Sequence, residues 1–161
     1  MGDNILTKEI VVLGDPKGKQ RPRFSRAGKF VRTYTPKETV NYENLVKLSY
    51  QDQVGDGKLF RGAVKAEICG VFPIPKSVSK KRREKMISGE IPYIKKIDSD
   101  NLAKSILDAL NNIAFDDDAQ VNDLHVMKMY GEQPRVEIRL QDNFKPIKAL
   151  FYIDKEKQQH E

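Results

Sequence analysis

Two aspartates and a lysine are spaced so that their side chains can act on one phosphate. Asp98 and Asp100 lie two residues apart, directly before a segment with helical periodicity, and an extended segment points both carboxylates to the same side. They can therefore share a cation. If the helix includes Asp100, Lys104 follows it by four residues and comes within one turn of its carboxylate. A carboxylate-held cation and an ammonium group can then converge on one phosphate.

A second acidic group, Asp116–Asp118, follows the same helix. Its adjacent like charges repel, and a fold that also gathers Asp98 and Asp100 nearby would raise the pKa of these carboxyl groups unless a cation neutralised them. Mg²⁺ is the natural candidate because hard oxygen ligands suit it. The sequence has only two histidines, His125 and His160, and one cysteine, so a zinc site is not expected.

The charges of the chain are segregated. The 161 residues carry a net charge of +6, but residues 98–123 contain seven aspartates and one base, Lys104. This window therefore carries −6, and subtracting it from +6 leaves +12 for the other residues. A basic protein with one acidic centre has the layout expected when a divalent cation lies between carboxylates and the phosphates of a polyanion.

Each acidic feature also has a purely structural alternative. Asp98 or Asp100 could cap the helix and favour its positive end. Lys104 with Asp108 could form an ordinary surface pair, and the later acidic run could be a solvated turn. Their joint occurrence in one acidic window favours the metal and phosphate interpretation.

Two segments are rich in bases, and we expect both to contact backbone phosphates. The first runs from residue 17 to 32, contains no acid and has Phe24 and Phe30 interleaved, which predicts a basic arm or hairpin. The second is an insert from residue 76 to 89, predicted to hold a helix capped by Ser77 or Ser79, although a solvated charged face would give the same pattern. The basic residues expected to bind are Lys17, Lys19, Arg21, Arg23, Arg26, Lys29, Arg32, Lys80, Lys81, Arg82 and Arg83.

Helix signals coincide at residues 35–38. Thr35 is expected as the N-cap, Pro36 at the first helical position and Glu38 at the third, where it would close a capping box. The helix is predicted to run to about Gln53. Its core face is expected to hold Tyr42, Leu45, Val46 and Tyr50.

The remaining periodicities predict an α+β fold. A short strand is expected at residues 9–13, an alternating strand at 64–72, and a second main helix at 101–112, with Leu102, Ile106, Ala109, Leu110 and Ile113 on its core face. Residues 124–130 and 135–140 alternate around a turn and predict a hairpin. Helices and strands mix without regular alternation, so a single domain with a mixed β-sheet packed with two main helices is expected.

The composition sets the expected environment. No apolar run approaches the length needed to cross a bilayer and no charged-then-apolar leader follows Met1, so no membrane partner and a cytoplasmic location are expected. Cys69 lies in an alternating apolar stretch and is expected to be a small core residue rather than a nucleophile.

Several motifs together resemble the RusA family of Holliday-junction endonucleases, which is common on bacterial prophages. The D-x-D-N-x-x-K element at residues 98–104 is followed thirteen residues past its lysine by D-D-x-Q-V at 117–121. Residues 18–23 (Gly-Lys-Gln-Arg-Pro-Arg), with Tyr34-Thr35-Pro36 and Tyr42-Glu43, are similar to phage-type members. The resemblance covers about residues 9–140 of one domain spanning 1–161, and leaves 141–161 as a C-terminal extension.

The resemblance implies a metal site made by Asp98, Asp100 and Asp118, with Asp117 matched but secondary and Lys104 near the scissile phosphate. It implies a homodimer that cuts two opposed strands of a four-way junction by Mg²⁺-dependent hydrolysis. The basic insert before Asp98 is longer than in the shortest members. Strict junction selectivity and a sequence preference for cutting are therefore not implied.

The resulting hypothesis is an endonuclease acting on four-way or branched DNA with Mg²⁺, or Mn²⁺ in its place, and no organic cofactor. Asp98, Asp100 and Asp118 would hold the ion and Lys104 would offset charge on the phosphate. Two rivals stay open at this point. One is a nuclease for flaps, single strands or RNA, and the other is a non-catalytic DNA-binding protein whose aspartates are caps and a solvated turn.

Overall fold

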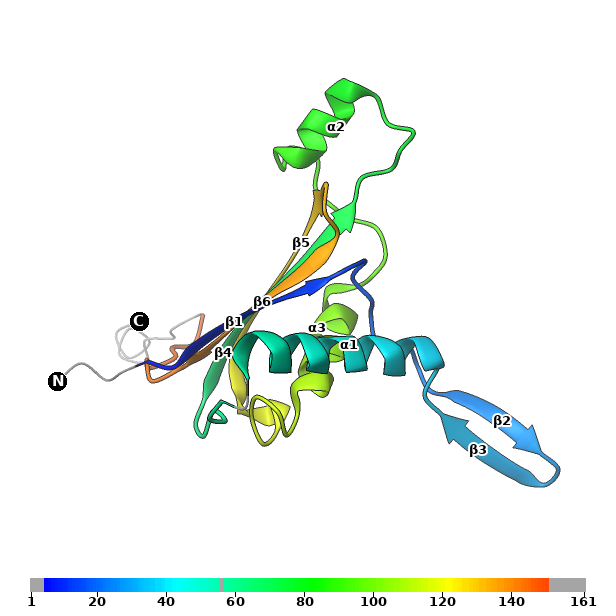
Figure 1. Cartoon of the computed structure of the whole chain (residues 1–161), viewed down its shortest axis with the longest axis vertical. Helices are drawn as coiled ribbons and strands as arrows, with labels where there is room; N and C mark the ends of the chain where they lie inside the picture. Colours follow the sequence, from blue (N-terminus) through cyan, green and yellow to red (C-terminus); the bar gives the residue numbers. More distant parts are fainter. Residues whose placement is uncertain (1–4, 56, 151–161) are drawn as a thin grey trace, which may run out of the picture.

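The fold is built on a mixed four-stranded sheet with two helices against one face (Figure 1). The computed structural model describes residues 5–55 and 57–150. The strand order is β1-β6-β4-β5, and a separate two-stranded sheet is formed by β2 and β3. The predicted α+β class, with a mixed sheet and two main helices, is confirmed. The main-sheet strands are β1 (Thr7–Leu13), β4 (Val64–Pro73), β5 (Val121–Gly131) and β6 (Arg135–Asp142).

The strands were predicted where they occur, but the pairing of the last two was predicted wrongly. β5 and β6 do not form a hairpin, because β4 lies between them, parallel to β5 and antiparallel to β6. Alternation of apolar residues identifies a strand and its buried face but carries no information about which neighbour it pairs with. β4 suits the interior position because its residues are buried or half-buried along nearly its whole length.

Helix α1 (Lys37–Val54) begins one residue later than predicted. Pro36 is the N-cap, with ψ at 141°, and no side chain caps the helix, so the expected Thr35–Glu38 capping box is not formed. An extended ψ excludes Pro36 from the helix, and its side chain offers no hydrogen-bond acceptor. The buried residues are Thr39, Tyr42, Val46 and Tyr50, whereas Leu45, expected in the core, is 40% exposed.

Helix α3 (Ser99–Leu110) is strongly amphipathic, as predicted. Leu102, Ile106 and Leu110 are fully buried in the main core, together with Val46 of α1. The helix ends at the predicted asparagine pair. Asn112 has φ 63°, a conformation that Asn tolerates better than most residues. The apolar stripe of α3 thus fixes the rotation of the helix and leaves its opposite side to solvent.

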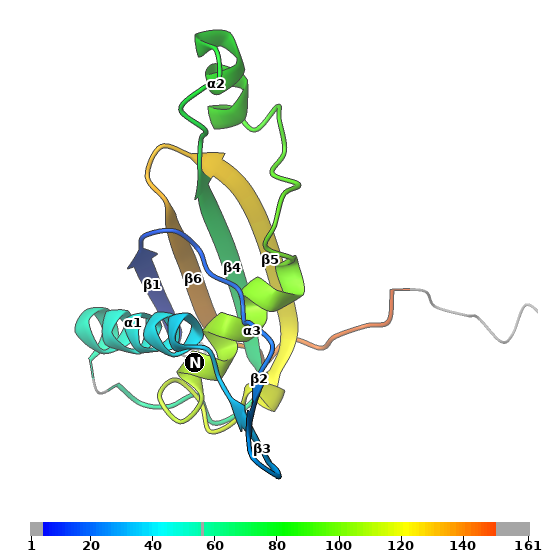
Figure 2. The ribbon, with the colours of Figure 1, turned by 90° about the vertical axis from the view of Figure 1, so that its right-hand side faces the viewer.

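Two basic elements project from opposite ends of this body. The hairpin of β2 (Arg23–Ala27) and β3 (Phe30–Tyr34) extends from one end, and α2 (Lys80–Ile87) caps the other (Figures 1 and 2). Of the two serines predicted as possible caps, Ser79 is the N-cap, since its side chain accepts a hydrogen bond from the backbone N–H of Arg82. A small cluster of Ile74, Met86 and Tyr130 holds α2 against β5.

The C-terminal extension expected at 141–161 is described only as far as residue 150, and its last eleven positions lie outside the described residues. β6 continues to Asp142, just past the expected end of the core. Within the described ranges, no helix has the length and apolarity that crossing a bilayer requires.

Truncating the core face of α3 should destabilise the whole domain. Ile106→Ala removes a fully buried side chain, and we expect a loss of about 2–5 kcal/mol in the free energy of unfolding, measured by urea denaturation. Leu48→Ala on α1, where the side chain is 63% exposed, is the control and should change it by less than about 0.5 kcal/mol. Equal effects of the two substitutions would contradict this packing.

Candidate active site

The outward face of α3 carries three charged side chains, each one turn apart. Asp100, Lys104 and Asp108 follow at intervals of four residues, opposite the buried stripe. The Lys104 ammonium nitrogen lies 4.0 Å from a carboxylate oxygen of Asp108, and its side chain is 62% exposed. The predicted orientation of Lys104, away from the core, is confirmed.

Asp118 lies beside this face, at the start of the short 3₁₀ helix η1 (Asp118–Gln120). Burial raises the pKa of its carboxyl group above the usual range, and the negative charges of Asp108 and Asp117 raise it further. The nearby Lys104 acts in the opposite direction but does not cancel the shift. The structure thus brings Asp118 of η1 close to Lys104 and Asp108 of α3. The end of α3 and the following turn lie between these residues in the chain.

The acidic turn is held in place by side-chain hydrogen bonds that sequence analysis did not anticipate. The Asp117 carboxylate accepts a bond of 2.7 Å from the backbone N–H of Ala119. Gln120 accepts bonds from the backbone N–H groups of Asp116 and Asp117, and its amide donates to the carbonyl of Phe60 at 2.9 Å. Asp117 therefore serves the turn, while Asp118 lies close enough to Lys104 and Asp108 of α3 for their charges to act on its carboxyl group. The glutamine of the D-D-x-Q-V element was the signal available for this role.

Asp98 and Asp100 lie at the beginning of α3. Asp98 occupies the N-cap position, but its side chain makes no capping hydrogen bond, and both residues are exposed. Capping therefore does not account for the Asp98 carboxylate. Across residues 5–55 and 57–150, no three acidic, histidine or cysteine side chains converge closely enough to share an ion. The structure thus places Asp118 beside Lys104 and Asp108, in the second half of α3, and Asp98 and Asp100 at the start of the helix.

Lys19 links the basic arm to both main helices. Its ammonium nitrogen lies 2.6 Å from Asp108 and 2.7 Å from Glu43, and its backbone N–H donates to the carbonyl of Asn101. Burial lowers the pKa of Lys19, but its bonds to these two carboxylates outweigh burial and raise the pKa above the ordinary value. Gly18 makes this approach possible, because a Cβ there would collide with Ile97. Lys19, expected among the phosphate-binding bases, is thus held between α1 and α3.

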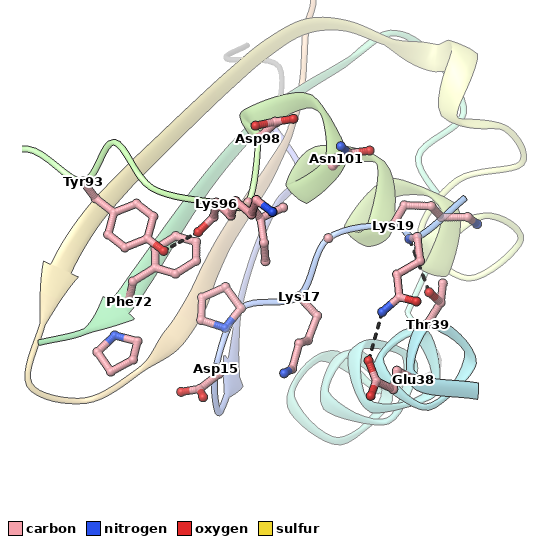
Figure 3. A pocket seen from close by; sticks show the side chains of 15 residues that line it. Asp15, Lys17, Lys19, Glu38, Thr39, Phe72, Tyr93, Lys96, Asp98 and Asn101 are labelled. Atoms are coloured by element: carbon pink, nitrogen blue, oxygen red, sulfur yellow. Dashed lines mark hydrogen bonds between the residues drawn. The ribbon is translucent and has the colours of Figure 1, made fainter. Parts of the chain in front are cut away.

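A cleft of about 560 Å³ opens beside Asp98 (Figure 3). Lys17 and Lys96 line it, and the rings of Phe72 and Tyr93 stack at one end with centroids 3.9 Å apart. Lys19 also lines this cleft, so three lysines and an aromatic wall lie next to an acidic helix start, an arrangement that can accept a phosphate and a flat group attached to it.

Apart from Lys17 in the cleft, the other expected phosphate-binding residues lie at the two ends of the molecule, with α3 between them (Figure 2). One set lies on and before the exposed hairpin, and the second on α2. Arg83 forms an ion pair with Glu132, with 3.4 Å between a guanidinium nitrogen and a carboxylate oxygen. The residues whose side chains lie at the surface are Lys17, Arg21, Arg23, Arg26, Lys29, Arg32, Lys80, Lys81 and Arg82.

The donor set of the acidic centre fits a hard divalent cation. All its candidate ligands are carboxylates, and burial together with the charges of Asp108 and Asp117 raises the pKa of the Asp118 carboxyl group. His125 lies on β5 and contacts Asp123 at 2.9 Å. Cys69 is half-buried rather than in the core, and burial raises the pKa of its thiol, which disfavours a nucleophilic role.

Comparisons with known proteins agree with these motifs. A family model described as endodeoxyribonuclease RusA matches residues 14–141. The uncharacterized protein YqaN of Bacillus subtilis (strain 168) is 35% identical over 136 residues, which cover 83% of this chain and 95% of that relative. The chain belongs to the RusA endodeoxyribonuclease family of Holliday-junction resolvases, and it is therefore a phosphodiester hydrolase that acts on branched DNA.

Proposed function

We propose that this protein resolves four-way DNA junctions by Mg²⁺-dependent hydrolysis of phosphodiesters in two opposed strands, in the cytoplasm of a bacterium or a phage-infected host. The observation that carries the proposal is the outward face of α3, where Lys104 lies beside Asp118 within a basic protein. The acidic groups at this face can bind a metal ion, and the lysine can contact the phosphate that the ion polarises.

Asp98, Asp100 and Asp118 are the proposed ligands, with Asp117 secondary. Mg²⁺ bound there would polarise the phosphate and lower the pKa of a water, and Mn²⁺ could replace it. Mg²⁺ is usually held by one or two carboxylates together with waters and substrate oxygens, rather than by a complete protein cage. The separation of these carboxylates in the protein alone therefore fits a site in which an oxygen of the DNA phosphate completes the coordination of the ion.

Lys104 is proposed to offset negative charge that develops on the phosphate oxygens. Its ammonium group is exposed and lies near Asp108, which is itself held by Lys19 at 2.6 Å. The ion pair with Lys19 therefore fixes the Asp108 carboxylate beside Lys104, and this role does not require Lys19 to contact DNA. A preorganised cation at the place where charge develops is worth most when it needs no rearrangement during the reaction.

Removing one proposed ligand should abolish most of the cleavage. We expect Asp100→Asn and Asp118→Asn each to reduce the cleavage rate on a synthetic four-way junction by about 100-fold or more, because the amide is neutral and binds Mg²⁺ weakly. Single-turnover kinetics would measure the rate, with flap and single-stranded DNA and RNA tested beside the junction.

The control for charge removal is Asp52→Asn on the exposed side of α1, which should cut like the unaltered protein. With junction DNA bound, which would supply the remaining oxygen ligands, Ca²⁺ in place of Mg²⁺ to prevent cutting should raise the melting temperature of the unaltered protein and of Asp52→Asn, but not that of Asp118→Asn. Full cutting by both site variants would reject the proposed ligands.

The bases of α2 are proposed to contact DNA phosphates. Lys80, Lys81 and Arg82 are exposed along one short helix. Replacing all three with alanine should reduce the slope of log affinity against log salt by up to about 3, since each contact to duplex DNA contributes about 0.9. Lys47→Ala on α1 is the control and should leave the slope unchanged. Titrations between low and high salt would show the difference, and an unchanged slope in the triple variant would exclude α2 from the interface.

The sheet face opposite the helices is proposed to bind a second copy of the chain, because paired cuts require two active sites. Four apolar side chains there are 37–58% exposed: Val11, Leu13, Met127 and Met129. This face lacks the excess of positive charge expected of a DNA-binding surface. The strand register places four acids and three bases on it: Glu9, Glu67, Asp123, Glu137, Lys65, Arg135 and Arg139.

A charge placed in this apolar patch should separate the dimer. We expect Met127→Glu to sediment as a monomer in analytical ultracentrifugation at concentrations where the unaltered protein is dimeric. Met127 is 55% exposed, so the monomer should still fold. Leu48→Glu on the helical side should remain dimeric, and a dimeric Met127→Glu would place the interface elsewhere.

A further inference from the structure

The β2–β3 hairpin exposes aromatic rings far from any hydrophobic core. Phe24 is 73% exposed and Phe30 is 76% exposed, and every residue of both strands is exposed. The hairpin extends away from the body of the protein (Figure 1). Two phenylalanines held in water on a projecting element do not help the fold, so they indicate a partner with apolar surfaces.

The strand register places these two rings on opposite faces of the ribbon. Phe24 is opposite Thr33, and Phe30 is opposite Ala27. Directly paired residues share a face and successive pairs alternate, so Phe24 shares its face with Val31 while Phe30 shares the other with Tyr34. The ribbon therefore presents one aromatic ring on each side.

The charge of the hairpin identifies the chemistry of the partner. Arg23, Arg26, Lys29 and Arg32 accompany the rings, and residues 17–32 contain no acid. A second copy of this hairpin would be repelled. Nucleic acid combines backbone phosphates with flat base faces, which stack on aromatic side chains. The groove of duplex DNA also admits a two-stranded ribbon.

Linear duplex and branched DNA differ in the base faces that they offer. Inside a linear duplex every base pair is stacked on both sides, whereas at an opened branch point the terminal base pairs of neighbouring arms have lost a stacking partner. A ribbon with one ring on each side matches two such surfaces facing each other. The geometry of the hairpin thus favours the branch point over the arms.

We propose that the hairpin enters the branch point as a wedge, with Phe24 stacking on the terminal base pair of one arm and Phe30 on that of the adjacent arm. This inference rests on the proposed action on four-way junctions. It assigns the discrimination between branched and linear DNA to two residues outside the acidic centre, and it gives the arginines beside them the role of holding the phosphates.

The test compares the full-length protein with Phe24→Ala/Phe30→Ala on a junction carrying 2-aminopurine at the branch point, with Ca²⁺ in place of Mg²⁺ to prevent cutting. The unaltered protein should increase the 2-aminopurine fluorescence, because the probe base loses a neighbouring base. The double variant should lose this signal, and its junction affinity should fall by roughly 10- to 100-fold, while its affinity for a linear duplex changes less than about threefold.

Three further variants separate stacking from other effects. Val31→Ala removes an exposed apolar side chain of the same hairpin and should behave like the unaltered protein. Arg26→Ala should weaken junction binding but keep the fluorescence increase, since a phosphate contact supplies affinity and does not unstack bases. Phe24→Leu/Phe30→Leu keeps apolar groups without a flat ring and should resemble the alanine variant. Unaltered junction preference in either double variant overturns the proposal.

The outcome is distinguishable from failure of the proposed reaction. Asp118→Asn should still produce the fluorescence increase although it does not cut, and the double phenylalanine variant should still cut a junction with unpaired bases at its centre in Mg²⁺. Absence of metal-dependent cutting by the unaltered protein would reject the reaction, whereas normal fluorescence and affinity in the double variants would reject the wedge. All hairpin variants should melt at the temperature of the unaltered protein, because the hairpin lies outside the core.

Discussion

The packing of one amphipathic helix determines which side chains are available for the proposed chemistry. Leu102, Ile106 and Leu110 are fully buried against the sheet, so α3 cannot rotate without exposing them. The side chains on its other face, Asp100 and Lys104, must therefore point outward. A rotation by one residue, about 100°, would move the chemical face partly into the core. The hydrophobic effect thus sets the orientation of groups that are themselves polar.

Two polar anchors bring distant parts of the chain to that helix. Lys19 joins the basic arm to α1 and α3 through Glu43 and Asp108, and Gln120 ties the acidic turn to the carbonyl of Phe60. Both anchors are partly shielded from water, which makes their bonds stronger than exposed ones. The arrangement of the site therefore depends on Lys19 and Gln120, which position it, as well as on Asp118 and Lys104, which would act on the substrate.

The sequence predicted elements well and relations between elements poorly. Helical spacing identified α3 and the outward direction of Lys104, because both depend only on local geometry. The position of β4 between β5 and β6 depends on long-range pairing, which alternation does not encode. Lys19 was expected to bind phosphates because its neighbours are bases, and its two acidic partners are 24 and 89 residues away in the chain. Gln120 was overlooked for a related reason, since its carbonyl partner lies 60 residues earlier.

In the proposed reaction, the separation of charge in this fold would link metal binding to DNA binding. Burial raises the pKa of the Asp118 carboxyl group and the negative charges of Asp108 and Asp117 raise it further, so gathering more carboxylates there without a cation would be unfavourable. Bases at the two ends attract a polyanion whose phosphate can supply further oxygen ligands to a cation between them. Because binding free energies are reciprocal, DNA that strengthens metal binding must be bound more tightly in the presence of the metal. A site that needs both partners is complete only when DNA lies across α3, which would restrict hydrolysis to correctly placed substrate.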